Sequence, residues 1–165
     1  MSISKNNCPI PFDQQPINEY LSLKKSYFFS LSLKNIKIFI LGFLLIFTCI
    51  FIFISFILLP FYYKLSIIKM LILDTIISDI VLLLIFIRLY LGWSYVVKRL
   101  VSATVFYEES GWYDGQIWVK PSNYLIHDRL IGFYQVMPFI VRIKYAFFFL
   151  ILVFALFSFF FLIFE

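Results

Sequence analysis

Three long apolar runs divide the chain. The first covers residues 38–60 and the last covers residues 145–164, and neither contains a charged side chain. About 20 apolar residues are enough to cross the hydrocarbon core of a bilayer. We therefore predict one transmembrane helix in each of these two runs.

The middle run is less uniform. Residues 70–97 are apolar overall but include Asp74, Asp79 and Arg88. We place a second transmembrane helix at residues 74–96, with Asp74 near one membrane interface. Arg88 then lies about two turns from the other end, close enough for its long side chain to reach water.

The polar segment at the N-terminus, residues 1–37, is predicted to contain one short helix. Asn18 is a suitable N-cap for a helix over residues 19–29. That helix would have apolar side chains on one side and Lys24 and Lys25 on the other, so we expect it to lie on a membrane surface.

The only other sizeable polar segment is residues 98–144. Branched and aromatic residues predict strands at 101–109 and 116–120, joined by a connection at 110–114 with turn signals. Ser122 is then a candidate N-cap for a helix over 123–135, which Met137 and Pro138 would end. The predicted fold is an all-α membrane protein of three transmembrane helices, with a β-hairpin and a short helix between the second and third.

Composition and charge support a membrane location and suggest an orientation. The chain is 63% hydrophobic and 14% charged, with a net charge of +5, whereas soluble domains are about a quarter charged. Five Lys or Arg residues precede the first run and six lie in 98–144. Cytoplasmic-type loops carry the positive excess, so we expect both segments on that side and the C-terminus opposite. We read the basic residues as topology signals and expect no nucleic-acid binding.

The candidate chemistry is sparse. Glu108, Glu109, Asp114 and Asp128 with His127 could bind a divalent ion, but adjacent strand residues point to opposite faces and no second His is present. His127 has no nucleophile at a recognisable spacing, and Cys8 and Cys49 fall in segments expected in water and lipid. We therefore expect no metal, no cofactor, no disulfide and no enzymatic activity.

Charged groups within an apolar run are costly and are candidate polar contacts. Asp79 and Arg88 are separated by about 13.5 Å along a helix axis, so they cannot pair within that helix. Two interpretations remain open. Each residue contacts another helix or partner, or the span is short and tilted and both groups meet lipid headgroups.

Several polar stretches resemble one known family. The N-terminal segment reads Cys8-Pro-Ile-Pro and then Gln14-Gln-Pro-Ile-Asn-Glu-Tyr, and the second run ends on Arg88-Leu-Tyr-Leu-Gly-Trp-Ser-Tyr. The most specific stretch starts at Tyr107 and reads Tyr-Glu-Glu-Ser-Gly-Trp-Tyr-Asp-Gly-Gln. Together these are similar to the hypothetical chloroplast reading frame 36 family.

The resemblance implies a small membrane protein of plastids and cyanobacteria, in the thylakoid. Combined with the distribution of Lys and Arg, this location predicts a stromal N-terminus and a lumenal C-terminus. It implies a role in assembly or maintenance of a photosynthetic membrane complex, and it supplies no catalytic residues. The alternative is a small transporter or channel subunit that acts as an oligomer. A membrane enzyme is a third possibility, for which the chain offers no candidate active site.

We expect the loop between the second and third helices to contact a partner protein. It combines aromatic anchors with charges, as interfaces do. The candidate contact residues are Glu108, Glu109, Trp112, Asp114, Trp118, Asp128 and Arg129. The aromatic residues Trp112, Tyr113 and Trp118 could equally bind a pigment. The alternative is that the candidate residues only fold the loop, with Trp112 and Trp118 resting on lipid and Asp114 serving the turn.

Overall fold

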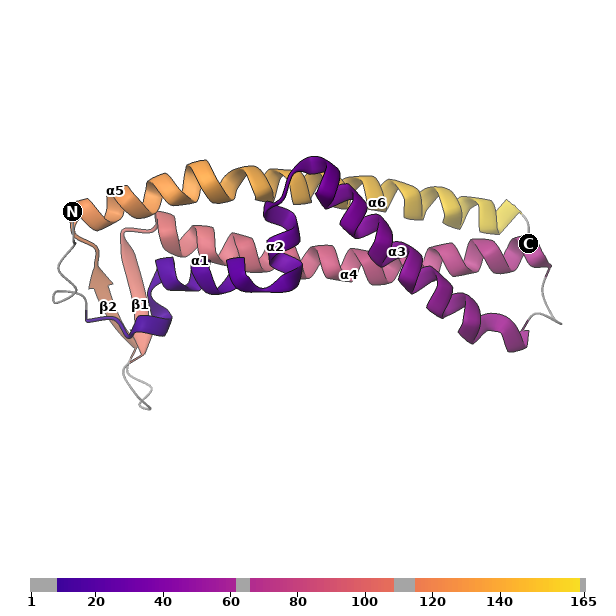
Figure 1. Cartoon of the computed structure of the whole chain (residues 1–165), viewed down its shortest axis with the longest axis horizontal. Helices are drawn as coiled ribbons and strands as arrows, with labels where there is room; N and C mark the ends of the chain where they lie inside the picture. The colour runs from indigo at the N-terminus through magenta and orange to yellow at the C-terminus, as the bar shows by residue number, and fades with distance from the viewer. Residues whose placement is uncertain (1–8, 62–65, 109–114, 164–165) are drawn as a thin grey trace.

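The computed structural model describes residues 9–61, 66–108 and 115–163. Within them the order of the longer elements is α1 (Pro16–Lys25), α2 (Tyr27–Leu33), α3 (Ile36–Leu58), α4 (Ile67–Val101), β1 (Thr104–Glu108), β2 (Gly115–Val119), α5 (Ser122–Leu130) and α6 (Met137–Ile163). The molecule is elongated, with α4 and α6 side by side along most of its length and α3 crossing them in one half (Figure 1). The hairpin, α1 and α5 form the other half, which we call the head.

Among the described residues, three helices are long and apolar enough to cross a membrane, as the three runs predict. They are Ile36–Leu58, Ile67–Val101 and a continuous helix over Ser122–Ile163. No residue in the most apolar stretch of the third helix is buried within the chain. That surface therefore lies open to lipid or to another protein.

The prediction that Met137 and Pro138 end a helix is wrong. The chain remains helical from α5 to α6 through a π-helical segment, Ile131–Val136. Within it the backbone N–H of Met137 donates to the carbonyl of Gly132, five residues back. Pro138 has no N–H and its ring needs extra room in the preceding turn. In the wider π-helical turns before Pro138 each N–H donates to the carbonyl five residues back, which leaves room for the proline ring, so the helix continues.

The second helix is longer than the sequence pattern predicts. The predicted segment 74–96 lies inside α4. The predicted strand at 101–109 is shorter than expected, because α4 runs to Val101 and β1 begins at Thr104. Asp74 and Asp79 are 3% and 2% exposed. They share the buried stripe of α4 with Leu82 and Phe86, so the two acids do not interrupt the helix.

The N-terminal helix begins earlier than Asn18. Pro16 occupies the first turn of α1, where its missing N–H costs nothing. The side chain of Asn18 instead donates to the carbonyl of Phe12, at 2.8 Å. Ser122 is likewise the first residue of α5 and makes no cap bond, since Pro121 holds the N-cap position. In Figure 1, α1 lies along α4, not flat across the bundle as a surface helix would.

The core is centred on Trp93 of α4, which is fully buried. Its ring packs against Tyr20 of α1, Phe29 of α2 and Phe139 of α6, with centroid distances of 6.1, 5.7 and 6.5 Å. Its indole N–H donates to the hydroxyl of Ser32, at 2.9 Å. One side chain thus fixes all three neighbouring helices on α4.

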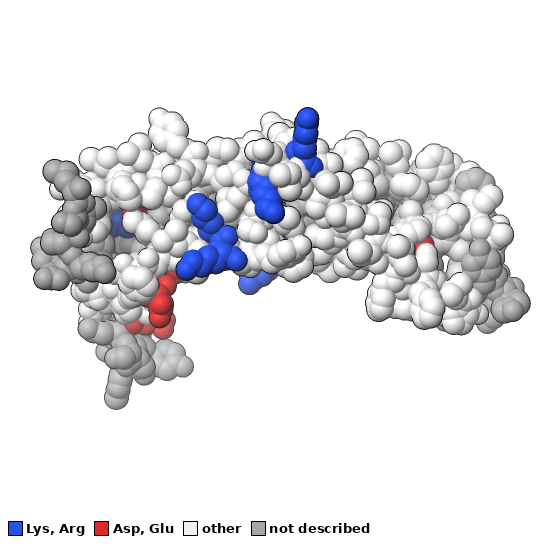
Figure 2. Space-filling model, in the orientation of Figure 1, with Lys and Arg blue, Asp and Glu red and all other residues white. Residues whose placement is uncertain are grey.

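Basic side chains gather where the two halves meet. Arg142 of α6 donates to the carbonyl of Lys34 at the end of α2, at 2.7 Å, and lies over the ring of Phe39. Phe39 in turn packs against Phe86 of α4, two residues before Arg88. Figure 2 shows Lys and Arg across the middle of the face in view, where little charge is visible over the half with α3. We call this level, with Lys34, Lys37, Arg88, Arg142 and Lys144, the basic belt.

Candidate functional site

The hairpin has two distinct faces. Its register pairs Val105 with Trp118 on one face and Phe106 with Ile117 on the other. Val105 and Tyr107 are buried against Ile10, with Trp118 half-buried beside them. On the opposite face Phe106, Ile117 and Val119 are 66%, 59% and 66% exposed. We call these three side chains the outer apolar face.

A buried ion pair ties the end of the hairpin to the end of α4. The ammonium group of Lys120 lies 2.6 Å from a carboxylate oxygen of Asp128, and both side chains are almost fully buried. The same ammonium donates to the carbonyls of Arg99 and Leu100, at 2.8 and 3.1 Å. The last carbonyls of a helix have no partner within it. Lys120 therefore caps α4, and Asp128 balances its charge.

Arg129 also contributes to the end of α4. Its Nε donates to the carbonyl of Val101 at 3.2 Å, although most of the side chain is exposed. A cation at a helix C-terminus also interacts favourably with the helix dipole. Both members of the Asp128-Arg129 pair thus help to join α5 to α4.

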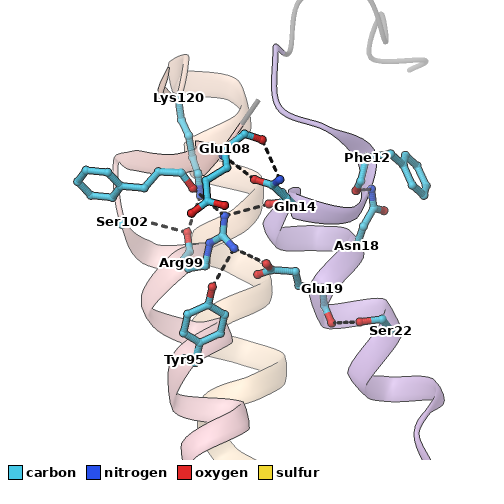
Figure 3. Close-up of polar contacts among 11 residues, drawn as sticks. Phe12, Gln14, Asn18, Glu19, Ser22, Tyr95, Arg99, Ser102, Glu108 and Lys120 are labelled. Atoms are coloured by element: carbon cyan, nitrogen blue, oxygen red, sulfur yellow. Dashed lines mark hydrogen bonds and ion pairs between the residues drawn. The ribbon is translucent and has the colours of Figure 1, made fainter. Parts of the chain in front are cut away.

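A second polar centre surrounds Arg99 (Figure 3). Its guanidinium forms an ion pair with Glu19 of α1 and donates to the hydroxyl of Tyr95, at 3.0 Å. It also donates to the backbone carbonyls of Gln14 and Phe106, at 3.0 and 3.1 Å. One side chain therefore joins the N-terminal segment, α4 and β1.

Gln14 completes this connection. Its side-chain amide donates to the carbonyl of Glu108 at 3.0 Å and accepts from the backbone N–H of Glu108 at 2.9 Å. An amide side chain that bonds both backbone groups of one residue imitates a neighbouring strand. The hairpin edge is thereby closed at Glu108, whose side chain stays exposed.

The Glu19 carboxyl is in an unusual electrostatic setting. Burial raises its pKa above the ordinary value, and the positive charge of Arg99 opposes that effect without cancelling it. One carboxylate oxygen is buried without a hydrogen-bond partner in the described structure. The contact with Arg99 thus holds α1 against α4.

A cavity of about 330 Å³ lies between the hairpin and the N-terminal segment. Trp118 and Tyr124 form part of its wall, with ring centroids 6.0 Å apart. His127 also lines it. Within the described residues no three His, Cys, Asp or Glu side chains are grouped to hold a metal ion.

The predicted contact residues fall into three groups. Glu108 and Arg129 are exposed and Trp118 is half-buried, whereas Asp128 is 3% exposed and does not reach the surface. The structure brings Trp118, Asp128 and Arg129 close to the same helix end. Glu109, Trp112 and Asp114 lie outside the described residues, as does the predicted connection at 110–114.

The two candidate intramembrane contact residues, Asp79 and Arg88, have different surroundings. Asp79 is buried in α4, and within the described structure both of its carboxylate oxygens lack a hydrogen-bond partner. Arg88 is exposed at the basic belt and forms no hydrogen bond or ion pair with any described residue. Asp74, by contrast, accepts a hydrogen bond from Ser55 of α3.

Sequence reasoning missed the two cations that organise the head. Arg99 and Lys120 were counted only as topology signals, because their roles depend on where α4 ends and on which strand passes that end. No local signal marks the role of Lys120, because the strand before it holds one aromatic residue, Trp118, and its ammonium meets the end of α4 only in the folded chain.

Comparisons with known proteins agree on one family. The profile of the family described as CGLD27-like, "Conserved in the green lineage and diatoms 27", matches residues 8–149. The chain is 54% identical to the protein ycf36 of Porphyra purpurea over 87% of this chain and 88% of that protein. It is 49% identical to the ycf36 protein of Cyanophora paradoxa, over 83% and 87% of the two chains.

A third relative is much longer. The Arabidopsis thaliana protein Conserved in the Green Lineage and Diatoms 27, chloroplastic, is 62% identical over 61 residues, which are 37% of this chain and 19% of that protein. No solved structure matches the chain.

Proposed function

Since the chain belongs to the CGLD27-like family, which includes the ycf36 proteins, we propose that it is a non-enzymatic accessory protein of a plastid membrane. Its three apolar helices cross that membrane, which is the thylakoid. The head holds a partner protein and thereby supports assembly or maintenance of a photosynthetic membrane complex. The family match and the chloroplastic relative support the plastid location.

The observation that carries this proposal is the outer apolar face of the hairpin. Phe106, Ile117 and Val119 are each more than half exposed on a segment that lies beyond the basic belt. Apolar side chains that cluster on an exposed surface mark an interaction site. Glu108 and Arg129 provide charged groups on the same head, which suits the polar rim of a protein interface.

Polar contacts also hold the head in one arrangement, as expected for a surface that binds a partner protein. Arg99 donates to the carbonyls of Gln14 and Phe106, which joins the N-terminal segment and β1 to α4. Lys120 donates to the carbonyls of Arg99 and Leu100 and pairs with Asp128, which joins the end of the hairpin to α4 and α5. A surface that is ordered before binding loses less conformational freedom when the partner docks. This arrangement favours a docking role over a purely lipid-anchoring role.

Orientation follows from the basic belt. Lys34, Lys37, Arg142 and Lys144 lie at the head-proximal ends of α3 and of the apolar part of α6. The positive-inside rule then places the head and the N-terminus in the stroma and the C-terminus in the lumen.

The docking role is tested by replacing Phe106 and Ile117 with Ser, together, in the organism that carries the protein. Both side chains are exposed, so the variant should accumulate in the membrane at a normal level. Complexes isolated through a tag on this protein should lose a partner that the unaltered protein retains. The matched control is Ile126→Ser, which removes a similarly exposed side chain, 59% exposed, from α5.

The proposal fails if the double variant keeps every partner of the unaltered protein. Native gel migration separates the transport alternative. A homo-oligomer of fixed size without other proteins would favour a pore built from several copies, for which the uncovered apolar surface of α6 would supply the contacts.

A further inference from the structure

Two hollows meet at Arg88 on the surface of α4. One, about 410 Å³, is lined by Val81, Leu84 and Ile85 of α4 and by Phe28 and Phe29 of α2. The other, about 520 Å³, lies on the head side of Arg88. Arg88 and Phe29 line both, so the two hollows are neighbours that share one wall.

The two hollows differ in chemistry. Val81, Leu84 and Ile85 belong to the uncharged stretch of α4, on the apolar side of the basic belt. The head-side hollow adds the polar groups of Glu19, Ser22 and Tyr95 to a wall that is otherwise mostly apolar. A molecule that fills both must therefore be amphiphilic, with its polar part at the belt and an apolar part toward the bilayer interior.

The side-chain charges where the two hollows meet determine the charge expected for the polar part of that molecule. Arg88 is exposed and has no ion pair or hydrogen bond within the described structure. Glu19 lines the head-side hollow, but its carboxylate is paired with Arg99. The balance at the junction is one unmatched positive charge, which an anionic headgroup complements. Basic pockets beside transmembrane helices bind such headgroups, and cavities of about 300–1,000 Å³ hold small ligands.

We propose that the two hollows form a binding site for one anionic lipid. Its phosphate headgroup lies on the guanidinium of Arg88, and one acyl chain lies along Val81, Leu84 and Ile85. The elbow between α1 and α2 at Ser26 closes the side of the site, since Ser26 and Phe28 line the apolar hollow. Arg88 thus holds a specific lipid instead of reaching toward any headgroup in the bilayer.

The test is native mass spectrometry of the full chain after reconstitution with phosphatidylglycerol or with zwitterionic phosphatidylcholine. Phosphatidylglycerol should stay bound on transfer from the membrane. Arg88→Gln should reduce its retention about tenfold, as expected for loss of a charge-assisted hydrogen bond. The control is Lys37→Gln, which removes one exposed charge at the same level outside both hollows and should change retention less than about twofold. Equal loss in both variants, or equal retention of the two lipids, overturns the proposal.

The apolar half of the site is tested without a change of charge. Leu84 is 60% exposed, so Leu84→Trp fills the groove with little strain on the fold, and it should reduce phosphatidylglycerol retention. Leu45→Trp, at a 56% exposed position on α3, should not. Millimolar inorganic phosphate should fail to displace the lipid. Unchanged retention in Leu84→Trp, or displacement by phosphate, overturns the acyl-chain contact.

The inference rests on the membrane placement proposed above, but the two fail separately. Extraction of the protein from membranes by alkaline carbonate would overturn the placement itself. A protein that resists extraction but retains no phosphatidylglycerol would overturn only the lipid site.

Discussion

At the scale of single residues, the pair Lys120 and Asp128 carries the largest expected effect on stability. Lys120→Met would leave Asp128 buried without its cation and would remove the ammonium donor from the carbonyls of Arg99 and Leu100 at the end of α4. Loss of one member of a buried ion pair costs about 3–5 kcal/mol. We expect a large fall in the midpoint of thermal unfolding, as measured by tryptophan fluorescence in detergent.

Two controls make this prediction specific. Lys98→Met removes an exposed lysine of α4, the helix that Lys120 caps, and should leave the midpoint nearly unchanged. The double variant Lys120→Met with Asp128→Leu removes both charges and should be more stable than Lys120→Met alone. Equal midpoints for Lys120→Met and Lys98→Met would contradict the capping role.

A second residue-scale prediction concerns Gly92. A Cβ atom there would lie 2.5 and 2.7 Å from ring carbons of Phe29, which is itself packed on Trp93. Gly92→Ala should therefore lower stability by about 1–3 kcal/mol through overpacking. At Gly42 the new atom would meet a mobile methyl group of Leu31 at 3.3 Å, so Gly42→Ala should be close to neutral. If both alanine variants unfold at the same temperature, the close approach of Phe29 is unimportant.

The contacts of single residues were hard to predict, because the sequence does not mark where α4 ends. Asp128 and Arg129 were predicted to contact a partner protein, since a surface role is the natural interpretation of charges in a polar loop, but Asp128 is buried. Their contacts with Lys120 and Val101 depend on a helix end that no local pattern marks. Gln14 raises the same difficulty, because its partner Glu108 is 94 positions away.

At the scale of elements, the contact of α1 with α4 depends on Arg99. Arg99→Gln should loosen the N-terminal segment, since the ion pair to Glu19 and the bonds to Gln14 and Phe106 are lost together. Limited trypsin digestion should then cut at Lys24 and Lys25 about tenfold faster, because opening of an element controls its proteolysis. Lys98→Gln is the matched control. An unchanged rate in Arg99→Gln would show that apolar packing alone holds α1.

Glu19 should respond differently to substitution. Its folded-state pKa is raised, so its carboxyl favours the folded state at low pH and that contribution disappears as pH rises through the raised pKa. Glu19→Gln keeps an acceptor for Arg99 and removes this titration. We expect its unfolding midpoint to depend less on pH between about 4 and 7 than that of the unaltered chain, by fluorescence-detected melting. Identical pH profiles would contradict this account.

The elements themselves were partly predictable. The apolar runs predicted three long helices and the turn signals predicted the hairpin, because burial in lipid and tight turns each leave a local pattern. The missed features are continuations: α4 runs on to Val101, and the third helix passes Pro138. A proline ends a helix only when the turn before it cannot widen, and that depends on packing that the sequence does not display.

At the scale of the whole molecule, orientation is the property to test. Trypsin added to sealed thylakoids from the stromal side should cut at the exposed pair Lys24 and Lys25 and remove the N-terminal segment. In inverted vesicles the same sites should be protected until detergent is added. Cutting in inverted vesicles and protection in sealed thylakoids would reverse the proposed topology.

The head-to-membrane arrangement was the hardest feature to predict from sequence. The pattern placed residues 98–144 in a loop, and a loop implies no fixed relation to the helices around it. The structure instead supports the hairpin on two continuous helices and on an N-terminal segment from the other end of the sequence. That relation arises from long-range contacts of Arg99, Lys120 and Trp93, none of which has a periodic signal.

The unbroken helix from Ser122 to Ile163 has a geometrical consequence. Its 42 residues give a length of about 63 Å, and about 30 Å of that is enough to cross a bilayer. In the proposed membrane placement, the remainder sets the height of the head above the membrane. Each residue of a helix also turns the chain by about 100°. Inserting or deleting one residue in this helix would therefore move the head by only about 1.5 Å along the helix axis but would rotate the outer apolar face by about 100°. The direction in which that face points is thus more sensitive to the length of the helix than its height is.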